Sequence, residues 1–67
     1  MPIVNINLKS GRSLDKKRML VEEVTKAICK SLDVSPNKVH IILSEMAPEN
    51  YSLSGVLTID QQDNNKS

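Results

Sequence analysis

The chain joins two apolar period-two segments through one amphipathic helical segment, within a short length. Residues 2–8 carry apolar side chains at every second position, which is typical of a strand. Residues 14–33 repeat apolar side chains at three- and four-residue intervals, which predicts a helix. Residues 39–44 predict a second strand. A crossover of this length and order predicts an α+β fold, a β-α-β subunit with two parallel strands and the helix on one face.

The chain is too short to stabilise such a subunit alone. Its 67 residues form at most one domain, and cores of this size are marginal without disulfides, metal or association. Cys29 is the only cysteine, and one cysteine with one histidine does not make a structural zinc site. The other face of a two-stranded parallel sheet would also be bare. We therefore predict a homo-oligomer whose aliphatic core is shared between copies, with no metal and no cofactor.

Breaking residues mark the limits of these segments. Ser13 is a plausible N-cap for the helix, and Pro36 ends it. Residues 46–51 are expected to form a loop, and residues 56–59 a short C-terminal hairpin or edge strand. We expect a single domain over residues 1–59 and a polar, disordered tail over residues 60–67.

Composition limits the classes of partner and the cell compartment that we expect for this chain. The formal net charge is +1, and a single aromatic residue offers no platform for stacking bases, so no nucleic-acid partner is expected. Five basic residues interrupt the first twenty positions, which lack the apolar run of a signal peptide, and no segment approaches membrane-spanning length. We expect a cytoplasmic protein with no membrane partner.

The second residue points to a chemical function. Initiator methionine is normally removed before a residue as small as proline, so Met1-Pro2 is expected to yield a chain that begins with a prolyl secondary amine. A main-chain α-amine ordinarily titrates at about 8, so modest burial or a nearby cation can leave it unprotonated and basic. Many proteins begin with Met-Pro and gain only a trimmed terminus, and the dipeptide alone does not decide between the two.

Several short motifs in order carry a family resemblance. Met1-Pro2-Ile3 opens a strand, Gly11-Arg12-Ser13 precedes a helix that contains Val21-Glu22-Glu23-Val24-Thr25, and Ser44-Glu45-Met46 closes the second strand. Over residues 2 to about 57 the chain resembles the 4-oxalocrotonate tautomerase family. The resemblance implies a hexamer built from dimers and a tautomerase activity, in which an amino-terminal proline is the general base for enol–keto conversion of unsaturated 2-oxo acids.

The resemblance assigns the catalytic roles to Pro2 and Arg12. Pro2 would carry the proton, and the planar guanidinium of Arg12 would hold the carboxylate of a small anionic 2-oxo or enol acid, reaching a neighbouring copy's proline. Taken alone, Arg12 is more typical of a solvent-exposed arginine beside a helix N-terminus than of a substrate-binding residue. One alternative is a proline-dependent hydratase, dehalogenase or decarboxylase, because relatives of the same fold use the proline in these reactions. A non-catalytic oligomer is a further alternative.

Three other positions are candidate substrate-binding residues. His40 stands where the best-known family members carry a catalytic arginine, and a neutral imidazole offers one donor instead of a fork. This departure predicts weak turnover of 2-hydroxymuconate and better turnover of monocarboxylates such as phenylenolpyruvate. Tyr51 stands at a common aromatic wall position, with packing at a subunit contact as the alternative. Lys9 would supply positive charge lost at His40, with an exposed turn lysine as the alternative.

Overall fold

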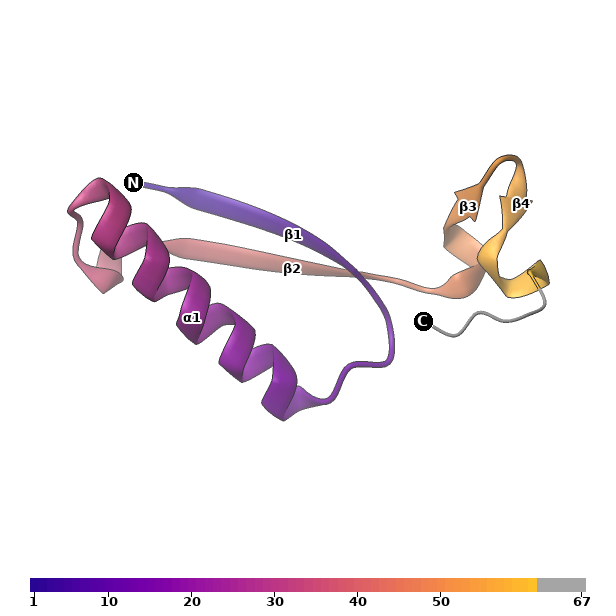
Figure 1. The fold of residues 1–67 in the computed structure, drawn as a ribbon, viewed down its shortest axis with the longest axis horizontal. Coiled ribbons are helices and arrows are strands. Elements are labelled where there is room, and N and C mark those ends of the chain that lie inside the picture. Colours follow the sequence, from indigo (N-terminus) through magenta and orange to yellow (C-terminus); the bar gives the residue numbers. More distant parts are fainter. Residues whose placement is uncertain (62–67) are drawn as a thin grey trace.

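The computed structural model describes residues 1–61, and within them a two-stranded parallel sheet carries one long helix (Figure 1). Strand β1 (Ile3–Lys9) pairs with strand β2 (His40–Met46), in a register that runs from Ile3 opposite His40 to Lys9 opposite Met46. Helix α1 (Leu14–Leu32) forms the crossover between them. The predicted β-α-β subunit is confirmed, although β2 begins one residue later and ends two residues later than predicted.

Helix α1 has a well-defined start and end. The hydroxyl of Ser13 accepts a hydrogen bond from the backbone N–H of Lys16 (3.2 Å), which satisfies one of the free donors of the first turn. Asp33 ends the helix in the left-handed conformation (φ 57°), and its backbone N–H donates to the carbonyl of Cys29. Pro36 then opens a short 3-10 helix, Pro36–Lys38, that leads into β2. The helix therefore begins at the predicted residue and ends one residue earlier than predicted, at Leu32, where Asp33 and not Pro36 terminates it.

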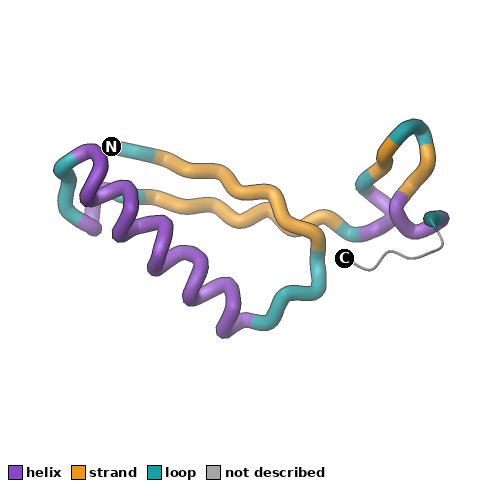
Figure 2. The backbone as a smooth tube through the Cα atoms, in the orientation of Figure 1, coloured by secondary structure: helices purple, strands orange, loops and turns teal. Residues whose placement is uncertain are grey.

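An ion pair shows which face of the sheet carries the helix. Nζ of Lys17 in α1 lies 2.6 Å from a carboxylate oxygen of Glu45 in β2. Because side chains alternate along a strand and Glu45 is opposite Leu8, the helix side of the sheet holds every second residue of both strands. These half-buried apolar residues are Val4, Ile6, Leu8, Ile41 and Leu43. They form the core between the sheet and the helix. Figure 2 shows the backbone of the helix running alongside the two strands.

The opposite face of the sheet has no cover within residues 1–61. Ile3 and Ile42 lie on it and are 61% and 50% exposed, and none of the described residues is fully buried. The Cα radius of gyration is 15.2 Å, whereas a compact domain of this length has about 11 Å. A chain in this shape leaves a large apolar area in water, which is the physical reason to expect association with further copies.

A small hairpin follows the sheet and stands apart from it at the far end of β2 (Figure 1). Strands β3 (Ser52–Leu53) and β4 (Val56–Leu57) are antiparallel and joined by Ser54 and Gly55, both at positive φ (56° and 82°). Two residues at positive φ define the type I′ turn that matches strand twist. A C-terminal hairpin is therefore confirmed, but the strand expected over residues 56–59 is shorter, because the backbone coils into a 3-10 helix at Thr58–Asp60.

The segments flanking the hairpin are partly regular. Within the loop expected over residues 46–51, a 3-10 helix forms at Pro48–Asn50. Beyond the hairpin, the side-chain amide of Gln61 donates to the carbonyl of Val56 (3.4 Å). Residues 62–67, most of the predicted tail, lie outside the described residues.

Candidate active site

The turn after β1 carries Arg12. Gly11 has φ 113°, a conformation that side chains rarely adopt, so a glycine fits this turn. Arg12 follows as an exposed residue, and within residues 1–61 its side chain makes no ion pair. It borders a hollow of about 240 Å³, whose other lining residues are Leu8, Lys16, Lys17 and Leu20. A guanidinium that lines a hollow together with apolar side chains is suited to hold the carboxylate of a small organic anion.

Arg12 also borders a second hollow. It has a volume of about 230 Å³ and is lined by Lys9, Ser10, Gly11 and Arg12. The backbone N–H of Ser10 donates to the carbonyl of Met46 (3.0 Å), which ties this turn to the end of β2. Lys9 and Arg12 thus border one hollow that no acidic side chain lines.

Tyr51 reaches the same end of the sheet. The Nζ of Lys9 lies 5.9 Å from the centroid of the Tyr51 ring, within the range of a cation–π contact. Tyr51 is half-buried, and its carbonyl accepts a hydrogen bond from the backbone N–H of Thr58 (2.7 Å). The structure therefore brings three of the five candidate residues together, namely Lys9, Arg12 and Tyr51.

Pro2 and His40 lie together at the opposite end of β1. The backbone N–H of His40 donates to the carbonyl of Pro2 (3.0 Å), while the imidazole is exposed and shares the bare face of the sheet with Ile3. Pro2 itself is half-buried. Met1 is 79% exposed, and while it is attached the nitrogen of Pro2 is part of a peptide bond. A basic amine therefore requires removal of Met1, and this residue is accessible.

The two groups of candidate residues cannot meet within one chain. Seven residues of β1 separate Pro2 from the turn that holds Arg12, and a strand of this length spans about 23 Å. A small organic acid cannot touch both ends of such a strand. A single site that uses both Pro2 and Arg12 must therefore draw them from two copies of the chain.

The basic cluster on the first helical turns has roles that the sequence pattern conceals. Residues 16–18 are typical of a solvated helix face, and Arg18 fits this, since it pairs with Asp15 at the exposed surface (2.9 Å). Lys17 instead forms the ion pair with Glu45 and, with Lys16, borders the hollow beneath Arg12. The ion pair between Lys17 and Glu45 can be expected only once the strand register is known, because the register places Glu45 on the helix side of the sheet.

Residues 1–61 also bear on metal binding and on membrane insertion. This part of the chain contains no cluster of three or more histidine, cysteine or acidic side chains placed to hold a metal ion. Nor does it contain a helix with the length and apolar character needed to cross a bilayer.

The fold and the placement of the candidate residues define a class: small β-α-β subunits with a proline at the start of the first strand and an arginine in the turn after it. A family model described as "Tautomerase enzyme" matches residues 2–61, and the chain belongs to this tautomerase family. A probable tautomerase of Halalkalibacterium halodurans is 41% identical over 61 residues, which cover 91% of this chain and 100% of the relative.

Solved structures agree with this assignment. A 4-oxalocrotonate tautomerase isozyme from Methylibium petroleiphilum superposes with a TM-score of 0.82 at 36% identity, over 87% of this chain and 91% of that one. A heterohexamer 4-oxalocrotonate tautomerase from Chloroflexus aurantiacus has a TM-score of 0.85 at 24% identity, over 92% of this chain and 100% of the other. The latter likeness bears on the fold alone.

Proposed function

We propose that the chain is an isomerase that converts the enol form of a small anionic 2-hydroxydienoate or 2-oxo acid into its keto form, with Pro2 as general base after removal of Met1. The observation that carries the proposal is Arg12, which makes no ion pair within residues 1–61 and lines one hollow together with Leu8 and Leu20. The family assignment supports the reaction class, and the accessible Met1 supports the base.

The proton transfer needs one base and one cation. The secondary amine of Pro2 takes the proton of the 2-hydroxyl group, and the electron pair moves along the conjugated chain. The resulting ammonium returns a proton to a carbon of the same molecule, so the product has the mass of the substrate. Arg12 binds the carboxylate and stabilises charge that builds on the 2-oxygen. In the assembled site, apolar residues and a guanidinium beside the amine would both disfavour its ammonium form.

Two copies of the chain complete each site in this proposal. If two subunits associate antiparallel along β1, the Pro2 end of one lies beside the Lys9–Arg12 turn of the other, and a twofold axis creates two such sites. Both sheet edges are free within residues 1–61 and the face opposite α1 is bare, which supports further association of dimers into a hexamer. The heterohexamer from Chloroflexus aurantiacus is a neighbour in fold.

The proposal is tested by following ketonisation of 2-hydroxymuconate and phenylenolpyruvate by ultraviolet absorbance. We expect Pro2→Ala to lower kcat by about 10²–10⁴-fold, the usual contribution of a positioned base. Arg12→Ala should lower kcat/KM by about 10- to 100-fold, since charge-assisted hydrogen bonds contribute about 1.5–3 kcal/mol. Arg18→Ala removes an exposed arginine of α1 and serves as the matched control. A fully active Pro2→Ala enzyme would reject the proline base.

Mixing the two inactive variants tests the shared site. A hybrid dimer of Pro2→Ala and Arg12→Ala chains contains one site with both native residues and one site with neither. After dissociation and random reassociation, half of the dimers are hybrids with one native site of two, so about a quarter of wild-type activity should return. If mixing restores nothing beyond the sum of the separate variants, the two residues do not act across a subunit boundary. Products of altered mass would instead indicate hydration, dehalogenation or decarboxylation.

A further inference from the structure

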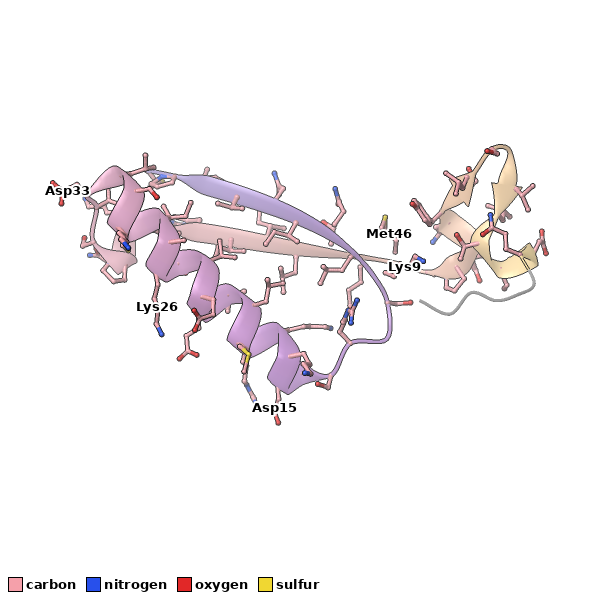
Figure 3. All side chains as sticks on the ribbon, in the orientation of Figure 1. Lys9, Asp15, Lys26, Asp33 and Met46 are labelled. Atoms are coloured by element: carbon pink, nitrogen blue, oxygen red, sulfur yellow. The ribbon has the colours of Figure 1, made fainter. Side chains whose placement is uncertain are left out.

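Lys9 lies beside Arg12 and adds a positive charge at the end of β1. It is the last residue of β1 and lies opposite Met46, as Figure 3 shows with both side chains labelled. Lys9 and Arg12 line the same hollow of about 230 Å³, and the remaining lining residues, Ser10 and Gly11, are uncharged. Within residues 1–61, Lys9 makes no ion pair. Two cations beside one hollow, without a protein carboxylate lining it, are suited to an anion with more than one charge.

Tyr51 limits where the ammonium of Lys9 can go. The ring centroid lies 5.9 Å from Nζ, and the backbone of Tyr51 is anchored by the hydrogen bond from Thr58. A lysine held against an aromatic face loses part of its rotamer freedom before any ligand arrives. Lys9 is therefore better ordered than a lysine that extends freely from a turn.

We propose that Lys9 is a specificity-determining residue that selects dicarboxylate substrates. In this arrangement Arg12 binds one carboxylate of an extended 2-hydroxydienoate dianion and Lys9 binds the other, while Tyr51 positions Lys9. The inference rests on the proposed function. It reverses the preference for monocarboxylates expected from His40, because the second charge comes from the end of β1 instead of the start of β2.

The alternative is that both cations contact the same carboxylate. Lys9 would then strengthen the binding of monocarboxylates and dicarboxylates alike. The two arrangements differ in the ratio of the two affinities, so a matched pair of ligands that cannot react separates them. Muconate and sorbate are both six-carbon dienes, and they differ in carrying two carboxylates or one.

The experiment is a calorimetric measurement of muconate and sorbate binding at fixed ionic strength to the oligomeric protein with Met1 removed. We expect Lys9→Met to weaken muconate binding about tenfold and to change sorbate binding less than twofold. Lys9→Arg should retain the preference for muconate. Lys26→Met removes a lysine that pairs with Glu23 on exposed α1, and should alter neither affinity. Equal loss for both ligands, no loss, or a wild-type protein that does not prefer muconate overturns the proposal.

Two substitutions of Tyr51 test its positioning role. Tyr51→Phe keeps the ring and should keep the preference for muconate, whereas Tyr51→Leu should reduce it about threefold without a change in sorbate binding. Combined with Lys9→Met, the Tyr51→Leu substitution should have no further effect on the ratio; an additive loss would contradict action through Lys9. These are binding measurements, so their failure is distinguishable from loss of the proline-base mechanism, which is judged by turnover of the Pro2→Ala protein.

Discussion

The ion pair between Lys17 and Glu45 should contribute measurably to holding α1 on the sheet. Its N–O distance is 2.6 Å and its side chains are 25% and 36% exposed, so water screens it only in part. Exposed pairs typically contribute about 0.2–1 kcal/mol, and breaking fully buried ones costs about 3–5 kcal/mol. A pair of intermediate exposure should show a coupling free energy of about 1–2 kcal/mol.

A double-mutant cycle measures this coupling. The variants are Lys17→Met, Glu45→Gln and the double substitution, compared by chemical denaturation at one fixed subunit concentration, because association contributes to the free energy of unfolding. The control is the same cycle on Arg18 and Asp15, which are 67% and 89% exposed and should couple by about 0.2–0.5 kcal/mol. A coupling at Lys17–Glu45 no larger than that of the control would refute the reasoning from partial burial.

Three further outcomes are expected. Gly11→Ala should destabilise the protein by about 1–3 kcal/mol in denaturant melts, because φ is 113° although the added methyl group meets no atom within 4 Å, whereas Ser10→Ala should change stability far less. Asp33→Asn should raise the free energy of unfolding by about 0.3–1 kcal/mol, because the substitution removes a negative charge from the helix C-terminus and asparagine tolerates the left-handed conformation. A loss of stability would contradict this. A chain that retains Met1, verified by intact mass, should associate normally in sedimentation yet show no turnover, because Pro2 then has no basic amine.

The order of elements was predictable because periodicity reports which side of an element is buried. The half-buried and exposed residues alternate along β1 as the sequence pattern indicates, with Val4, Ile6 and Leu8 toward the helix. The strand over residues 56–59 was predicted too long because an apolar run does not show where the backbone begins to coil. Ile59 belongs to a 3-10 helix, although isoleucine is a residue type that is enriched in strands.

The candidate site was only partly accessible to sequence reasoning. A proline, an arginine and their spacing are visible in the chain, but the partner of Lys17 is 28 positions away and depends on the register between β1 and β2. The contact between Lys9 and Tyr51 likewise depends on how the segment after β2 folds back. Such contacts follow from tertiary geometry, which local patterns do not contain.

The length of β1 has a consequence for how such an enzyme is switched on. In the proposed arrangement, each chain would contribute its two ends to two different reaction centres, and none of these centres would exist in a solitary subunit. Far below the dissociation constant of the dimer, the rate would rise with the square of the total chain concentration. Expression level alone would then set a threshold for activity, and dilution would silence the enzyme without any inhibitor.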